Sequence, residues 1–306
     1  TETGKCFSAG YTMIFLPTLL SWLAIQYQFS LKELQRDQWL WLWSNWVGQK
    51  LTPLLGLQAT ILVTLILPAM FLAAILATLG GWFFGLIGWL ITLVVVLYSL
   101  GRDDYCAACK EVVESLHNHD LALADSAIKP DDYPQVRERL AYCAYGSWFP
   151  VIFWFLILGA PGALFYRMLS IFAQSVGPIG SQNTVSESSD DSEACAQSHI
   201  QQDANSLLGW FDWLPVRLWA LTCALAGSFS LGFAIIRRSL LTIETTADFL
   251  DSVVVASAEK NESAQSSDYI DDWQTVAADN IDSYRDLNTR VMTILLVAVL
   301  LLVVFI

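Results

Sequence analysis

A stretch of 51 consecutive residues without a charged side chain, Leu51 to Gly101, constrains this chain more than any other feature. As one helix it would be about 76 Å long, whereas the hydrocarbon core of a bilayer is about 30 Å thick. A single crossing cannot use this length, but two crossings joined by a turn can. The stretch therefore predicts a helical hairpin in a membrane, and it argues against a soluble enzyme with one globular core.

The composition supports the same class of protein. Hydrophobic residues make up 55% of the 306 residues and charged residues only 15%, against about 45–50% and 25% in average soluble proteins. The formal net charge is -13 and the sequence has no basic cluster, so nucleic acid is excluded as a partner. Six cysteines are too few for a disulfide scaffold. No catalytic residue, cofactor or metal ligand is predicted.

Apolar windows predict an all-α, multi-pass membrane helix bundle of about six membrane segments, with a range of four to six. They lie in residues 1–28 (an N-terminal tail and the first helix), 54–100 (a transmembrane hairpin that reverses at Gly80–Gly81), 145–172, 211–236 and 291–306. The first segment has no basic n-region and no cleavage site, so we expect a retained helix. The last segment is short for a full span, at about 24 Å.

Four polar segments separate these helices. Segment 29–53 contains four tryptophans (Trp39, Trp41, Trp43 and Trp46) within eight residues, next to polar residues, and predicts an interfacial helix. Segment 101–144 has helical periodicity and predicts a cytoplasmic helical loop. Segment 173–210 is acidic without an apolar period, so we expect a mobile loop. Segment 237–290 is an acidic cytoplasmic segment that ends in an amphipathic helix.

The basic residues predict the orientation in the membrane. Segments 29–53, 101–144 and 237–290 hold 13 of the 16 Lys and Arg residues. Cytoplasmic loops carry such an excess, so these three segments face the cytoplasm and both ends of the chain lie outside it.

Two motifs each allow a structural and a functional interpretation. Cys106-x-x-Cys109, followed by His117-x-His119, could bind a metal or act in redox chemistry. Histidines two apart on a helix point about 200° from each other, which favours simple packing. The small residues of Gly159–Ala163 allow close helix packing, but they also fit a broken helix that exposes backbone groups to a ligand.

Six charged residues near the membrane are candidate ligand-binding residues. Arg102, Asp103 and Asp104 form either a solvated helix end or a site in which Arg102 binds an anionic ligand and the two carboxylates act as a base or bind a metal. Charged residues inside membranes pair with one another or serve function. We therefore expect Arg167, Asp212 and Arg217 either to clamp two helices or to bind an anionic lipid or a cell-wall fragment.

Three further motifs follow one another along the chain. They are Tyr-Ser-Leu-Gly-Arg-Asp at 98–103, Phe-Trp-Phe-x3-Gly-Ala-Pro-Gly-Ala-Leu-Phe-Tyr-Arg at 153–167 and Phe-Asp-Trp-Leu-Pro-Val-Arg-Leu at 211–218. Together with the C-terminal hydrophobic helix, they resemble the AmpE family of bacterial inner-membrane proteins associated with β-lactamase induction. The resemblance implies a regulatory or signalling role in the cell-envelope and antibiotic response, with the lipid bilayer and other membrane proteins as partners.

The same motifs are similar to those of the membrane cobinamide-phosphate synthase (CobD/CbiB) of cobalamin biosynthesis. The synthase has a polar Glu-Ser-x-x-Glu-Asn-Thr run before its Phe-Trp segment. The aligned residues 138–144 here are Glu-Arg-Leu-Ala-Tyr-Cys-Ala, without the Glu-Asn-Thr. This difference favours the AmpE-like interpretation. The alternatives are the synthase activity and a structural subunit of a membrane complex.

Overall fold

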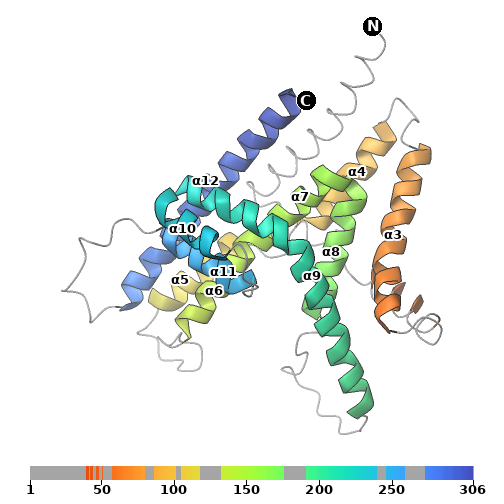
Figure 1. Ribbon diagram of the computed structural model, residues 1–306, viewed down its shortest axis with the longest axis horizontal. Helices are drawn as coiled ribbons and strands as arrows, with labels where there is room; N and C mark the ends of the chain where they lie inside the picture. The colour runs from red at the N-terminus through yellow and green to blue at the C-terminus, as the bar shows by residue number, and fades with distance from the viewer. Residues whose placement is uncertain are drawn as a thin grey trace. The chain divides into compact units, whose positions relative to one another are not determined.

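The computed structural model describes helices and short turns in the parts of the chain that it places (Figure 1). These parts are residues 39–40, 42–43, 46–47, 50, 57–79, 86–100, 105–117, 132–175, 191–239, 246–258 and 273–305. Within them there is no strand, so the predicted all-α class is confirmed. The predicted first membrane helix and the candidate residues Arg102, Asp103 and Asp104 lie outside the described residues.

The chain divides into two compact units, each built from two stretches of sequence. Unit 1 comprises Thr1–Leu100 and Pro150–Asp212, and unit 2 comprises Gly101–Phe149 and Trp213–Ile306. The helices of unit 1 are α3 (Leu57–Leu79), α4 (Leu86–Ser99), α7 (Phe149–Leu158, from its second residue), α8 (Ala160–Ser175) and the first part of α9 (Asp191–Ala226). Those of unit 2 are α5 (Tyr105–His117), α6 (Tyr133–Gly146), the end of α9, α10 (Phe229–Ser239), α11 (Thr246–Ala258) and α12 (Trp273–Phe305).

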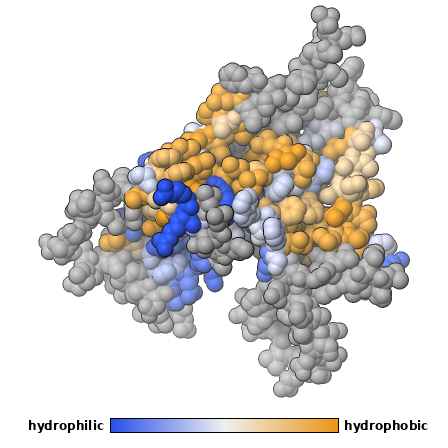
Figure 2. Space-filling model, in the orientation of Figure 1, coloured by the Kyte–Doolittle hydropathy of each residue, from blue (hydrophilic) through white to orange (hydrophobic). Residues whose placement is uncertain are grey.

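Helix α8 forms the centre of unit 1 and packs against α3 and α4. Its residues Ala163, Met168 and Leu169 are fully buried. Helices α3 and α4 contain no charged residue and are apolar on every side, which is typical of helices surrounded by apolar material. Large apolar side chains remain exposed on both helices, and Figure 2 shows broad hydrophobic areas on the surface.

Two tryptophans of segment 29–53 donate hydrogen bonds from their ring nitrogens to other parts of unit 1. Trp39 Nε1 donates a hydrogen bond to the Tyr98 hydroxyl at 3.0 Å, and Trp43 Nε1 donates to the Thr64 carbonyl oxygen at 3.1 Å. The described residues of the segment are helical. These tryptophans therefore help to attach the segment to α3 and α4, whatever their position relative to a membrane.

Helix α11 forms the centre of unit 2 and packs against α6, α10 and α12, while α12 also packs against α5. Leu250 and Val253 of α11 are fully buried, as is Ile281 of α12. The rings of Tyr145 and Trp219, 6.1 Å apart and edge to face, add to this core. The helix expected at the end of segment 237–290 and the last apolar segment form one continuous helix, α12.

The structure corrects the prediction of a mobile loop over 173–210. Helix α8 continues to Ser175, and residues 191–210 are helical because α9 begins at Asp191 and runs for 36 residues. The sequence from 194 to 208 contains three alanines and two leucines, which are strong helix formers. Their propensity outweighs the polar composition that led to the prediction of a loop.

The predicted segment 211–236 also differs from a single helix. Helix α9 ends at Ala226, and α10 begins at Phe229. The Ser228 N–H leaves the helical pattern and donates to the Ser257 carbonyl oxygen of α11 at 2.9 Å. Tertiary packing against α11 therefore interrupts a segment that its apolar composition alone made look continuous.

One helical stretch in the described parts, Tyr133–Leu158, is long and apolar enough to cross a membrane by length and composition. Inside the structure, 56% of its most apolar window is buried. Leu62–Thr78 and Leu86–Ser99 are shorter apolar helices. These findings establish the helical class, whereas the number of membrane crossings stays a prediction.

Candidate functional site

The Gly-Ala-Pro-Gly-Ala motif forms a corner between α7 and α8. Gly159 lies between the two helices with φ of +73°, a conformation that favours glycine. Its N–H donates to the Phe155 carbonyl oxygen at 2.8 Å, and its own carbonyl oxygen accepts from the Gly162 N–H at 3.0 Å. Gly159 thus ends one helix and begins the next, so the helix is broken at this motif, and the exposure of its backbone groups to a ligand stays a prediction.

Gly162 allows the two arms of this corner to approach closely. A Cβ atom at this position would lie 2.5 Å from Leu158 Cβ and 2.7 Å from the Trp154 carbonyl oxygen. Distances below 3.0 Å are essentially never seen for real Cβ atoms. The close packing that the small residues predicted is therefore present within the corner itself.

A buried tyrosine–aspartate contact lies beside this corner in unit 1. The Tyr166 hydroxyl donates to Asp212 Oδ1 at 2.8 Å, and the two residues are only 3% and 1% exposed. The Phe211 ring packs against Trp154 and Phe165, with centroids 5.0 and 5.1 Å apart. A hydrogen bond from the hydroxyl offsets part of the cost of burying the carboxylate. Residues 211–212, which begin the motif at 211–218, therefore meet the motif at 153–167 in one aromatic and polar centre of unit 1.

Of the three predicted membrane charges, two belong to unit 1 and one belongs to unit 2. Arg167 is buried in unit 1, with 7% of its surface exposed, as is Asp212. Arg217 belongs to unit 2. The prediction that the three form a single cluster therefore involves both units and stays a prediction.

Arg217 joins three helices within unit 2. Its Nη1 donates to the Trp213 carbonyl oxygen of α9 at 2.9 Å, and its Nη2 donates to the Ser239 carbonyl oxygen of α10 at 3.4 Å. The guanidinium lies 4.3 Å from the centroid of the Trp213 ring and 6.0 Å from that of Phe249 in α11. Because Ser239 is in the last turn of α10, Arg217 satisfies a carbonyl that lacks a helical partner. These contacts link α9 to α10 and α11 inside unit 2, and the predicted clamp between the segments 145–172 and 211–236 stays a prediction.

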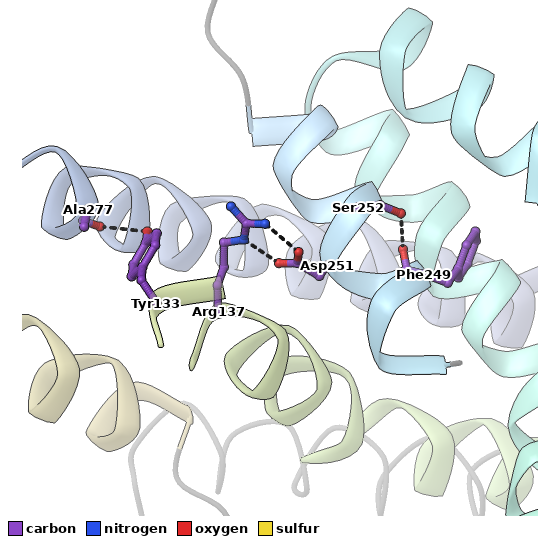
Figure 3. A network of polar contacts seen from close by, with 6 residues as sticks. All are labelled: Tyr133, Arg137, Phe249, Asp251, Ser252 and Ala277. Carbon is purple, nitrogen blue, oxygen red and sulfur yellow. Dashed lines mark hydrogen bonds and ion pairs between the residues drawn. The ribbon is translucent and has the colours of Figure 1, made fainter. Parts of the chain in front are cut away.

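A second polar site in unit 2 was not found from the sequence. Arg137 of α6 holds Asp251 of α11 through two hydrogen bonds, Nε to Oδ1 at 2.7 Å and Nη2 to Oδ2 at 2.8 Å (Figure 3). The side chains are 27% and 14% exposed, so the pair is largely removed from water. Next to it, the Tyr133 hydroxyl donates to the Ala277 carbonyl oxygen of α12 at 3.3 Å.

The Arg137 guanidinium borders a narrow cavity with a mostly apolar lining. The cavity is lined by Tyr105, Arg137, Leu140, Ala141, Ala144, Trp219, Cys223, Val254, Tyr284, Leu287 and Asn288. Burial raises the pKa of both Tyr105 and Tyr284, so their hydroxyls are uncharged at neutral pH. Within the described residues, Asn288 Oδ1 is buried and accepts no hydrogen bond. The arrangement can hold a small uncharged hydrogen-bonding molecule, such as an ordered water.

A signal for this site does exist in the sequence. Tyr133 and Arg137 are four residues apart on one helix, and Tyr284 and Asn288 are four apart on another, so each pair shares a helix face. Such polar pairs are common on solvated helices, and nothing in the sequence indicates that these two faces are buried together.

The cysteine motif belongs to unit 2, where Cys106 is half-buried and Cys109 is buried. Cys109 is 1% exposed, and burial raises the pKa of its thiol to about 11. Metal ligation needs the thiolate, which burial disfavours here. No group of three or more His, Cys, Asp and Glu residues in the described ranges could hold a metal ion. The side chains of the two motif histidines lie outside those ranges.

Comparisons with protein-family models, with curated proteins and with solved structures give no match to this chain.

Proposed function

We propose that this chain is a multi-pass protein of the bacterial inner membrane with an AmpE-like regulatory role in β-lactamase induction and envelope stress. The observation that carries the proposal is the contact between the two longest resembling motifs, in which Tyr166 donates to the buried Asp212. A buried carboxylate is costly and is retained where it pairs or functions. Residues of two resembling motifs, Tyr166 and Asp212, thus lie in one packed centre of unit 1.

Exposed apolar surface supports the membrane location. Met70 and Phe71 of α3 are 64% and 65% exposed, and Trp210 of α9 is 81% exposed. Contiguous surfaces of this kind are unfavourable in water and are typical of sites that contact a membrane or another protein. The uncharged helices α3 and α4 and the apolar stretch Tyr133–Leu158 would supply crossings in the lipid.

The geometry gives no support to the synthase alternative. The residues that align with its Glu-Asn-Thr are Tyr142, Cys143 and Ala144. Ala144 is buried and offers a methyl group to the cavity of unit 2. A phosphate-bearing substrate would need carboxylate, amide or hydroxyl groups there. A regulatory function, which needs no such groups, is therefore proposed.

An induction assay tests the proposal. The gene would be deleted in its native bacterium, and β-lactamase activity would be measured after addition of a β-lactam inducer. We expect altered induction that the wild-type gene restores, and weaker restoration by Tyr166→Phe, which removes the donor to Asp212. Asp279→Asn, at an exposed position of α12, is the matched control and should restore fully.

Two results would contradict the proposal. One is normal induction after deletion. The other is that the gene restores growth of a cobalamin auxotroph that lacks its cobinamide-phosphate synthase, because this result would establish the enzyme instead.

A further inference from the structure

Helix α10 has one face buried against its own unit. Gly232, Ile236 and Ser239 are buried, and α10 packs against α11. A Cβ at Gly232 would lie 2.7 Å from Ser257 Oγ and 2.9 Å from Ala224 Cβ. The backbone of α10 therefore lies tightly on its neighbours, and the direction of its other face is fixed.

The exposed side of α10, next to this buried face, carries aromatic rings followed by two cations. Phe229 and Phe233 are 50% and 41% exposed, and their rings stack with centroids 5.3 Å apart. Arg237 and Arg238 are both exposed in the last turn of the helix. Arg237 lies one turn beyond Phe233 on the same face. Spacings of four residues place the two rings and the first arginine in one stripe. The stripe runs from apolar to positively charged.

The length and pattern of α10 fit the boundary of a membrane better than its interior. Eleven residues make a helix of about 16 Å, roughly half of the hydrocarbon thickness. Aromatic and aliphatic side chains on the free face of such a helix enter the acyl region, while arginines reach the head groups. Guanidinium groups bind phosphate through paired hydrogen bonds.

We propose that α10 forms a binding site for an anionic phospholipid, with Arg237 and Arg238 on the lipid phosphate and Phe229 and Phe233 against its acyl chains. This inference rests on the proposed membrane location. The charge of the two arginines selects an anionic lipid over a zwitterionic one, since each basic residue near a membrane surface contributes about 1 kcal/mol. That contribution corresponds to about fivefold in binding per arginine.

Native mass spectrometry of the full chain, purified in a mild detergent, tests the site. The protein would be titrated with phosphatidylglycerol and, separately, with phosphatidylcholine of the same acyl chains. We expect phosphatidylglycerol to bind more tightly by about 20- to 30-fold for two arginines. Arg237→Gln/Arg238→Gln should lose most of this preference, and Arg237→Lys/Arg238→Lys should keep most of it.

A matched control separates this site from the overall charge. Lys110→Gln/Arg139→Gln removes two exposed positive charges from other helices of unit 2 and should keep the preference. Equal binding of both lipids by the wild type would overturn the proposal, as would an unchanged preference in Arg237→Gln/Arg238→Gln. Extraction of cell membranes with alkaline carbonate is measured in parallel. Release of the chain there contradicts the membrane location, whereas the detergent titration judges the lipid site alone.

Discussion

Replacing Gly162 with alanine tests the corner between α7 and α8. The added Cβ would meet Leu158 Cβ at 2.5 Å and the Trp154 carbonyl oxygen at 2.7 Å. The carbonyl oxygen belongs to the backbone of α7, so it cannot move away without displacing that helix. Overpacking of this kind costs about 1–3 kcal/mol.

Alanine also gains up to about 1 kcal/mol over glycine inside a helix. We therefore expect a net loss of about 1–2 kcal/mol for Gly162→Ala. Gly209→Ala is the matched control in the same unit, because a Cβ there has nothing within 4 Å, and it should gain about 0.5–1 kcal/mol. The two variants differ in sign although the chemical change is identical.

Thermal unfolding of the detergent-purified protein, followed by tryptophan fluorescence, measures this difference. With about 2–4 °C of Tm for each kcal/mol, Gly162→Ala should unfold several degrees below Gly209→Ala. If Gly162→Ala were as stable as Gly209→Ala, the two arms of the corner would not approach as described, and the argument would be refuted.

Three further predictions concern unit 2. Asp251→Ala removes the carboxylate that pairs with Arg137, and thermal unfolding should show a loss of about 1–3 kcal/mol in stability. The control Asp282→Ala breaks the exposed Arg285–Asp282 pair at 3.3 Å and should cost less than about 0.5 kcal/mol. Equal losses in the two variants would contradict the burial of the Arg137–Asp251 pair. A variant with Cys109 as its sole cysteine should react with iodoacetamide at pH 8 about 100-fold more slowly when folded than when unfolded, because its thiol pKa of about 11 exceeds the ordinary value of 9.0. A folded-state rate equal to the unfolded one would disprove the burial of the thiol. The same pKa shift contributes fully to the stability of the fold below pH 9, and this contribution falls as the pH rises toward 11. Arg217→Gln should lower the Tm by several degrees because it releases α10 from α9. The control Arg290→Gln, at an exposed position of α12, should leave the Tm unchanged. Equal Tm values for the two variants would argue against a stabilising role of the Arg217 contacts.

The helical class could be predicted from the sequence because apolar content and periodicity are local properties. The same holds for the corner at Gly159, where glycine and proline mark the break within a few residues. The helix over 191–210 is not evident from the sequence because its acidic, polar composition is typical of a loop, whereas the helix depends on the propensity of its alanines and leucines. The break at residues 227–228 was missed because it depends on a hydrogen bond to Ser257, which lies in a different helix.

The second polar site shows a different limit. Arg137 and Asp251 are separated by 114 residues, and each alone resembles a solvated charge on a helix surface. Their pairing follows from the packing of α11 on α6, which periodicity within either helix does not encode. The residues at 153–167 and 211–218 could be selected in advance because their motifs, unlike Arg137, combine charge with long apolar surroundings.

The topology of the chain tests the central claim most directly. Single cysteines would be placed at positions 120 and 185 of a cysteine-free variant and labelled in intact cells with a membrane-impermeant maleimide. Segment 101–144 carries five of the basic residues and segment 173–210 carries none. An inner-membrane protein with the proposed orientation should be labelled at position 185 and protected at position 120 until the cells are permeabilised. Labelling at 120 with protection at 185 would reverse the orientation, and equal labelling of both in intact cells would contradict a membrane crossing between the two positions.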